Sequence, residues 1–350
     1  MKLSLDWYTL RALEWDAFQF IDFCATHQID SVQLSARRHF KSLREEDLLP
    51  AKRRAAERGV QLEIGMGSVN KYASSFNREL GPAEEQLSAV LRAAAFVGSP
   101  SVHVVLGGRA ERTGPVPLEQ QIEECVRVAR AVAPLARDLG VKLAFETHGD
   151  LLGRELAQLV AAAGPDTCGV CLDTGNPSMA AEDPLLTTEL LARYTMTGHI
   201  RDSRIWAVPG GAMVQHVPVG QGNVDMRRIA ALLKEQAPPG AVFGLEILTG
   251  SPPRFLPYFD PQSDFWKPYP KMLARDLARF HALAMHGKPE PLEQVVAPRG
   301  ADGSPAPPPA ALAEQLRAQA LRHLEESVRY CRDVLGVGER DRSPGTASGA

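Results

Sequence analysis

The chain has 350 residues, of which 44% are hydrophobic and 23% are charged, so it can bury a large core and is neither disordered nor fibrous. Its 39 basic and 42 acidic residues give a net charge of −3, which argues against a nucleic-acid partner. No apolar run is long enough to span a membrane, and the opening sequence MKLSLDWYTL lacks the apolar core of a signal peptide. The 5 cysteines are scattered and form a poor disulfide framework. We therefore expect a cytoplasmic protein with neither nucleic acid nor a membrane as partner.

Short runs that favour strands alternate with amphipathic stretches along residues 1–290. This pattern predicts an α/β protein, the (β/α)8 TIM barrel with a C-terminal helical extension. An open doubly wound sheet is the alternative, but no Gly-rich turn follows the first strand. The expected strands span residues 2–7, 31–35, 60–66, 101–107, 141–146, 168–173, 197–202 and 241–248, and the expected helices lie near 14–26, 44–58, 82–97, 117–138, 151–163, 183–194, 225–236 and 268–286.

The composition changes after the expected barrel, which we take to span residues 1–290. Residues 291–311 are rich in Pro, Gly and Ala and predict a linker. Residues 312–335 place Leu and Val near helical spacing and predict a C-terminal helix, whereas residues 336–350 have the composition of a flexible tail. The helix can dock on the barrel or on a second copy of the chain, so a homo-oligomer is compatible with the sequence.

Titratable residues interrupt the last four expected strands at or near their carboxyl ends, where TIM barrels carry their active sites. An unpaired charge in such a strand costs several kcal/mol. Only Lys142 and Arg201 lie on these strands as cations, too few to neutralise three acids, whereas a divalent cation pairs all of them. Three carboxylates and one imidazole suit Mn²⁺ or Mg²⁺, and Co²⁺ or Zn²⁺ also fit. The expected metal ligands are Glu146, Asp173, His199 and Glu246.

These residues occur in the order Glu, Asp, His, Glu within FETHGD, LDTGNP, GHIRD and LEI, followed by VPVGQGNVD at 217–225. The pattern resembles the xylose-isomerase-like TIM barrels, a superfamily of sugar isomerases and epimerases, over roughly residues 1–290. The resemblance implies that the four residues bind one divalent ion and that Glu146 and Glu246 transfer protons. Asn176 departs from the pattern, because many members have a histidine there that binds substrate or a further metal. The multi-zinc DNA-repair members need that histidine, so DNA repair is disfavoured.

The chemistry of such a site favours proton transfer next to a carbonyl. A metal that chelates a carbonyl and the neighbouring hydroxyl stabilises the enediolate formed by deprotonation, with Glu146 and Glu246 as acid and base. We therefore predict a metal-dependent isomerase or epimerase of a keto-sugar or sugar acid, in carbohydrate metabolism. The alternative is a metal-dependent lyase, a decarboxylase or dehydratase of a keto-sugar acid, on the same scaffold. A non-catalytic sugar-binding barrel would not need all four ligands.

Five further residues are candidates for binding the substrate, although each also fits a structural role at the rim of the barrel. A histidine two residues after Glu146 can hydrogen-bond a sugar oxygen, and a tryptophan after the first strand can stack on a sugar face or plug the barrel. Two arginines are candidate binders of a substrate carboxylate or phosphate. The substrate-binding candidates are Trp7, His148, Asn176, Arg201 and Arg204.

Overall fold

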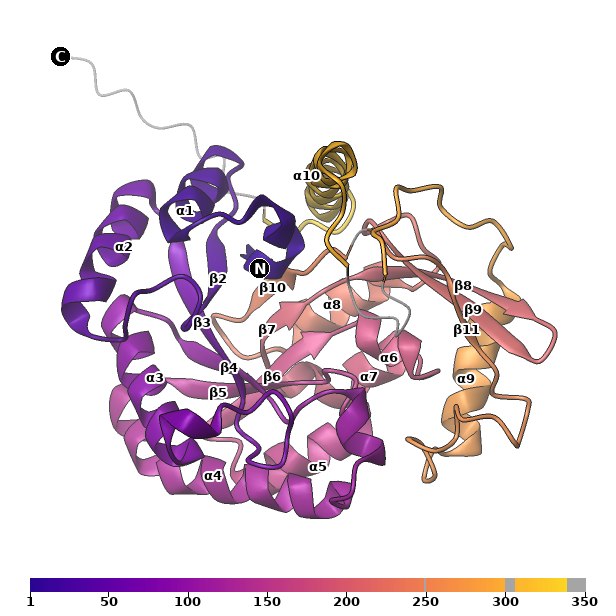
Figure 1. Ribbon diagram of the computed structural model, residues 1–350, viewed down its shortest axis with the longest axis horizontal. Coiled ribbons are helices and arrows are strands. Elements are labelled where there is room, and N and C mark those ends of the chain that lie inside the picture. The colour runs from indigo at the N-terminus through magenta and orange to yellow at the C-terminus, as the bar shows by residue number, and fades with distance from the viewer. Residues whose placement is uncertain (249, 300–305, 339–350) are drawn as a thin grey trace.

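The computed structural model describes residues 1–248, 250–299 and 306–338. Eight parallel strands form one sheet in the order β10-β1-β2-β3-β4-β5-β6-β7, and helices surround it (Figure 1). The sheet closes into a barrel where Ile200, directly after β7, donates its N–H to the carbonyl of Gly244 in β10 over 2.8 Å. The predicted TIM barrel is therefore confirmed. The strands are β1 (Lys2–Asp6), β2 (Ser31–Ser35), β3 (Gln61–Ser68), β4 (Ser101–Val105), β5 (Lys142–Glu146), β6 (Cys168–Asp173), β7 (Thr195–His199) and β10 (Val242–Leu245).

The closing contact between β7 and β10 depends on a glycine. A Cβ atom on Gly244 would lie 2.0 Å from the carbonyl oxygen of Gly198. A side chain at position 244 would not fit into this gap. The backbones of β7 and β10 can therefore come this close only because residue 244 is a glycine.

The predicted helices are present, with ends that differ from the expected ones by a few residues. Amphipathic spacing accounts for their packing: α1, for example, buries Phe20, Ile21 and Cys24. Its start is fixed by a capping box in which Asp16 and Gln19 exchange hydrogen bonds. The helices are α1 (Ala17–Thr26), α2 (Glu45–Arg58), α3 (Ala83–Val97), α4 (Leu118–Leu139), α5 (Gly153–Ala163), α6 (Gly175–Met179), α7 (Pro184–Leu191), α8 (Met226–Gln236), α9 (Ala274–Met285) and α10 (Ala310–Asp333), with 3₁₀ turns η1 (Trp7–Leu13), η2 (Arg78–Leu80), η3 (Arg109–Thr113) and η4 (Ala192–Tyr194).

A second sheet, which the sequence reading did not anticipate, follows β7. It contains β8 (Asp202–Val208), β9 (Gly211–Val217) and β11 (Arg254–Leu256) in the antiparallel order β11-β9-β8. The expected strand 197–202 thus spans the end of β7 and the start of β8. Helix α9, expected as the last helix of the barrel, packs against β8 and β9 instead.

The C-terminal helix α10 fills the place between α1 and α8 in the outer layer. Arg332 donates to the carbonyl of His27, at the end of α1, over 2.8 Å. Lys234 of α8 donates to the carbonyl of Leu335, just after α10, over 2.6 Å. The predicted helix is present and docks on the barrel, whereas the predicted domain boundary at residue 290 stays a prediction. Within the described part of the chain, no helix is both long and apolar enough to cross a membrane.

Candidate functional site

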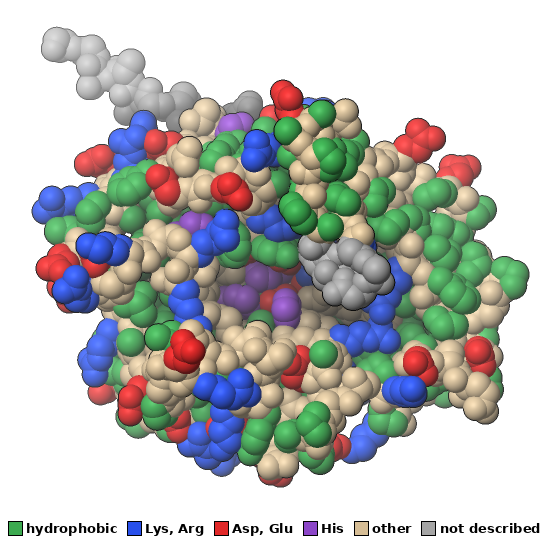
Figure 2. Space-filling model, in the orientation of Figure 1, with side chains coloured by type: hydrophobic (Ala, Val, Ile, Leu, Met, Phe, Trp, Pro, Cys, Tyr) green, Lys and Arg blue, Asp and Glu red, His purple; other side chains and the backbone are tan. Residues whose placement is uncertain are grey.

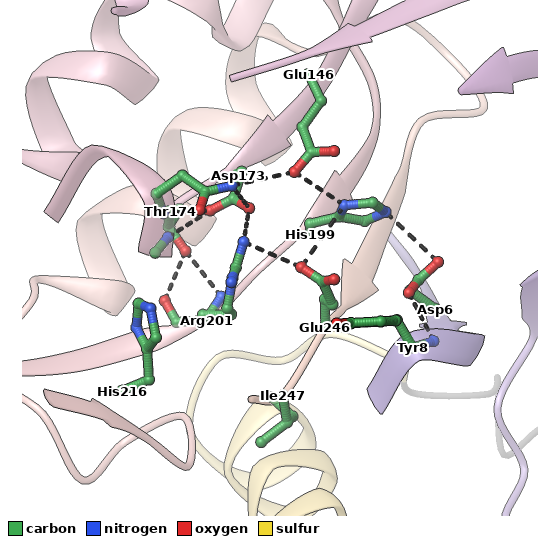
Figure 3. Close-up of polar contacts among 12 residues, drawn as sticks. Asp6, Tyr8, Glu146, Asp173, Thr174, His199, Arg201, His216, Glu246 and Ile247 are labelled. Atoms are coloured by element: carbon green, nitrogen blue, oxygen red, sulfur yellow. Dashed lines mark hydrogen bonds and ion pairs between the residues drawn. The ribbon is translucent and has the colours of Figure 1, made fainter. Parts of the chain in front are cut away.

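The four predicted metal ligands converge at the carboxyl end of the barrel (Figure 3). Glu146, Asp173 and His199 are the last residues of β5, β6 and β7, and Glu246 follows β10 directly. One donor atom from each of the four lies within 4.8 Å of the others. All four are buried, and the most exposed, Glu246, is only 8% accessible. Strand closure thus brings together four side chains from residues spread over a hundred positions of the sequence.

The imidazole of His199 lies among the carboxylates. Its Nδ1 is 3.2 Å from Glu146 Oε1 and 3.8 Å from Glu246 Oε2. Burial raises the pKa of Glu146, but the charges of His199 and His148 and a hydrogen bond from His103 together hold that pKa well below its usual value. The structure therefore favours the ionised form of Glu146, which can accept a proton or bind a cation.

Arg201 points into the same cluster. Its Nη2 contacts Asp173 Oδ2 and lies 3.0 Å from Glu246 Oε2. Lys142, the other cation considered in the sequence, points instead toward the carbonyl of Pro165, 3.4 Å away, at the opposite end of β5. Arg201 therefore pairs with two of the three buried acids, and its single positive charge does not balance the three carboxylates.

The donor set fits a divalent cation. Among the described residues, His199 Nδ1 and Glu246 Oε2 are buried and contact Glu146 and Arg201 only as ion pairs, without hydrogen-bond geometry. A cation between these atoms would use the lone pairs that the two ion pairs leave without a hydrogen bond. One nitrogen and several carboxylate oxygens are ligands that Mn²⁺, Mg²⁺, Co²⁺ and Zn²⁺ accept.

Four polar side chains surround this cluster, and three of them were missed in the sequence. Gln33 Nε2 lies 2.6 Å from His199 Nε2 and 3.0 Å from Asp6 Oδ2. His103 Nε2 lies 2.8 Å from Glu146 Oε2. Asp6 ends its strand as the predicted ligands do, so the same signal could have found it. Gln33 and His103 lie inside apolar strands, where a polar residue more often has a structural role. The fourth side chain, Asn176, donates to Asp173 Oδ2 over 2.8 Å.

A cavity of about 240 Å³ opens above the cluster, and Figure 2 shows His and acidic side chains at the bottom of this hollow. Pockets for drug-sized ligands begin near 300 Å³, so this volume suits a small molecule. Trp7 and His148 line the cavity together with Glu146, His199 and Glu246. These two predicted substrate-binding residues are therefore in position to touch a ligand.

The other three predicted substrate-binding residues are not among those that line this cavity. Asn176 and Arg201 lie within the carboxylate cluster. Arg204 donates to the carbonyls of Gln221 and Glu290, over 3.0 and 2.9 Å, on the second sheet. Its position therefore gives no support to the predicted role in binding a substrate anion.

The loop at 217–225 is held by Asp202, the first residue of β8. The Asp202 carboxylate accepts hydrogen bonds from the backbone N–H groups of Gly220 and Gly222, over 2.9 and 3.0 Å. A Cβ atom on Gly222 would lie 2.1 Å from Asp202 Oδ1, so only glycine allows this approach. The glycine motif of the sequence therefore has a structural role in this loop.

The fold and this site define a (β/α)8 barrel with a buried cluster of acids and one histidine at the carboxyl ends of its strands. Residues 21–280 match the model of the xylose isomerase-like TIM barrel family, and the chain belongs to that family. Proteins similar to this chain include a sugar epimerase and a decarboxylase, so the fold is one used by enzymes that process sugars.

A curated relative, the 3-oxo-isoapionate decarboxylase of Pectobacterium atrosepticum, is 24% identical over 185 residues. The match covers 53% of this chain and 55% of the relative, so the chain spans about half the length of that protein. A D-psicose 3-epimerase crystallised in the presence of D-fructose superposes with a TM-score of 0.58 at 16% identity, covering 96% of this chain and 100% of that one. The IolI protein with a bound zinc atom superposes with a TM-score of 0.55 at 16% identity, covering 81% and 96%. At these identities the structural matches establish the fold alone.

Proposed function

We propose that this chain is a divalent-metal-dependent isomerase or epimerase of a keto-sugar or sugar acid. The observation that carries the proposal is the convergence of Glu146, Asp173, His199 and Glu246 within 4.8 Å beneath a cavity. The zinc atom bound in the structure of the IolI protein, which shares this fold, is consistent with a divalent ion here. The oxygen-rich donor set favours Mn²⁺ or Mg²⁺, and Co²⁺ or Zn²⁺ remain compatible with it.

A divalent ion in this cluster supplies a Lewis acid for negative charge that develops on a substrate oxygen. Glu146 and Glu246 reach the cavity from β5 and from the end of β10. In the proposed reaction, one glutamate accepts the proton of the carbon next to the carbonyl. The other then returns a proton to the opposite face, which inverts that carbon and gives an epimer. Transfer of the proton along the carbon pair gives an isomer instead. His148 and Trp7 contact the substrate from the cavity wall.

The second candidate function is a lyase acting on a keto-sugar acid. The similarity to a decarboxylase over 185 residues favours it specifically. In that reaction the bond to the carboxylate breaks, carbon dioxide leaves, and a single glutamate suffices to protonate the remaining carbanion. Both reactions place negative charge on the same oxygen, so they share every residue of the site.

The two candidate functions differ in the mass of the product. We expect the purified chain with Mn²⁺ in D₂O to incorporate deuterium next to the carbonyl of at least one member of a panel of keto-sugars and keto-sugar acids. Proton NMR detects this exchange, and mass spectrometry separates an epimer from a product that has lost carbon dioxide or water. If the metal-loaded chain exchanges no proton in any member of the panel, the proposed chemistry is contradicted.

A further inference from the structure

Cys171 of β6 is a buried thiol that has no part in the site proposed above. It lies two residues before Asp173, so the two side chains point to the same side of the strand, into the barrel. Cys168, three residues before Cys171, points to the opposite side. In the sheet, Cys171 is paired in register with Glu146 of β5. The thiol therefore lies one layer below the acidic cluster.

His103 of β4 brings a second imidazole to the same place. Strands β4 and β7 are not neighbours in the sheet, yet the ring centroids of His103 and His199 are 4.7 Å apart. A Cβ atom on Gly65 would lie 3.2 Å from His103 Nδ1, so this nitrogen faces β3, whereas Nε2 faces Glu146. Among the described residues, one donor atom from each of His103, Cys171 and His199 lies within 4.8 Å of the other two.

Two imidazole nitrogens and one thiolate sulfur form a softer donor set than the carboxylates above them. Such donors select Zn²⁺, or its softer congener Cd²⁺, over Mn²⁺ and Mg²⁺. Zn²⁺ lies about 2.0–2.1 Å from nitrogen and about 2.3 Å from sulfur, so the donors of one ion are at most about 4.4 Å apart. The three donors are close to this arrangement. Both histidines line the cavity above the acidic cluster, so an ion can reach them from there.

His199 belongs to both donor sets. In a neutral imidazole one nitrogen carries a proton and only the other has a free lone pair, so the ring binds one ion at a time. An ion held by the sulfur-containing set therefore withdraws His199 from the set that includes Glu146, Asp173 and Glu246. Occupation of one set excludes full coordination by the other.

We propose that His103, Cys171 and His199 form a second metal site, which binds Zn²⁺ or Cd²⁺ through sulfur and excludes Mn²⁺ from the four-residue site above it. Binding replaces the S–H bond of Cys171 by a metal–sulfur bond, and the proton passes to the solvent. No electron is transferred. The inference goes beyond the proposed function, because it concerns which ions the chain takes up, whatever reaction it catalyses.

Titration of the metal-free full chain with Cd²⁺ tests the sulfur ligand directly, because a cadmium–thiolate bond has an ultraviolet absorption band that oxygen and nitrogen ligands do not produce. We expect this band to saturate at about one Cd²⁺ per chain. Cys171→Ala and Cys171→Ser should lack the band. Cys168→Ala, which removes another buried thiol of the same strand, is the matched control and should keep it.

Thermal unfolding and circular dichroism show whether each variant is folded, and two replacements of different polarity are used so that a folded Cys171 variant is obtained. Absence of the band in the wild type overturns the proposal. Persistence of the band in a folded Cys171 variant also overturns it.

Electron paramagnetic resonance of the Mn²⁺-loaded chain tests whether the two sites exclude each other, because released Mn²⁺ regains its sharp signal. We expect about one equivalent of Cd²⁺ to release Mn²⁺ from the wild type. In Cys171→Ala the Cd²⁺ concentration for half release should rise about tenfold or more, since even an outer contact to a metal ligand is worth about 10- to 100-fold in affinity. A wild type that binds Cd²⁺ through sulfur and keeps its Mn²⁺ contradicts the proposed exclusion.

Neither measurement depends on turnover, so failure of this site and failure of the proposed function give different results. A chain that exchanges no deuterium in any substrate, but forms a cadmium–thiolate band that requires Cys171, has the second metal site and not the proposed reaction. A chain that exchanges deuterium with Mn²⁺ and forms no band has the reaction and not the second site.

Discussion

Gln33 Nε2, on β2, lies 2.6 Å from Nε2 of His199, the last residue of β7. This contact fixes the imidazole so that its other nitrogen, Nδ1, faces Glu146 and Glu246. Because an amide nitrogen donates, Nδ1 carries the ring proton in this arrangement. For Nδ1 to bind the proposed ion, Nε2 must carry that proton instead, and the Gln33 amide must turn its oxygen toward it. Such outer contacts to a metal-binding histidine set both its orientation and its affinity.

Replacing Gln33 by alanine should weaken metal binding by about 10- to 100-fold, the usual cost of losing such an outer contact. Competition with a metal-binding dye measures the affinity, and Gln120→Ala, which alters an exposed amide on α4, is the control. Unchanged affinity in Gln33→Ala would show that the contact does not position His199.

Asp173→Ala should reduce metal affinity more than Gln33→Ala does, because it removes a donor of the cluster itself. The Asp173 carboxylate also accepts from the backbone N–H groups of Gly175 and Asn176, over 2.6 and 2.8 Å, so Asp173→Asn is the companion variant that retains volume and one acceptor oxygen. Metal analysis of each folded variant measures how much of the ion it retains. Undiminished occupancy in both variants is incompatible with the proposed site.

Glu246→Gln should leave the chain folded with much of its metal, but lower turnover by about 100-fold or more, the range for loss of a proton-transfer group. The amide retains the volume of the side chain and an oxygen donor. Turnover and metal content are measured on the same preparation. Near wild-type turnover with metal bound would favour the lyase, with Glu146 as the only proton-transfer group.

Glu182 should make stability depend on pH. Burial raises its pKa to about 7 from a usual 4.5, so folding favours the protonated form. The stabilisation from this group is present below the unfolded-state pKa and is lost as pH rises to about 7. Relative to Glu182→Gln, the wild type should therefore lose stability between about pH 5 and about pH 8. The amide oxygen can still accept from Gly153 N–H and Thr187 O–H.

Urea unfolding of both proteins at the two pH values checks this, with Glu57→Gln on the surface of α2 as the control for removing one charge. A difference between wild type and Glu182→Gln that is the same at both pH values would contradict the assignment.

Leu324→Ala in α10 should destabilise the fold by about 2–5 kcal/mol, because this leucine is 1% exposed and its loss leaves a cavity. Metal content per folded chain should not change, since none of the residues that line the active cavity belongs to α10. Denaturant titration measures the stability, and Arg322→Ala on the exposed face of the helix is the control. Loss of metal at full folding would mean that α10 supports the site directly.

The sequence located the barrel and the cluster because both leave local signals. A barrel strand reads as a short apolar run, and a charge that ends such a run, such as Asp173 or Glu146, is conspicuous. Gln33 carries no charge and gave no such signal. The hairpin of β8 and β9 was missed because it lies between the expected strand 197–202 and the expected helix 225–236, where no element was predicted.

Other features depend on contacts that no local pattern encodes. The position of α10 depends on contacts with residues far away in the chain, such as the hydrogen bond from Arg332 to the carbonyl of His27. Whether an arginine is paired is likewise decided in three dimensions. Arg201, on an expected strand, lies at an acidic cluster, whereas the buried Nη1 atom of Arg109 has no hydrogen-bond partner among the described residues.

The closure of β10 against β7 has a consequence for how the protein is made. Glu246 leaves the ribosome long after Glu146, and the contact between Ile200 and Gly244 that brings them together forms only when the last barrel strand arrives. A nascent chain that ends before β10 has Glu146, Asp173 and His199 but lacks the fourth donor, and its barrel is open between β7 and β1. The four-residue site proposed for the ion is therefore complete only after β10 has joined the barrel.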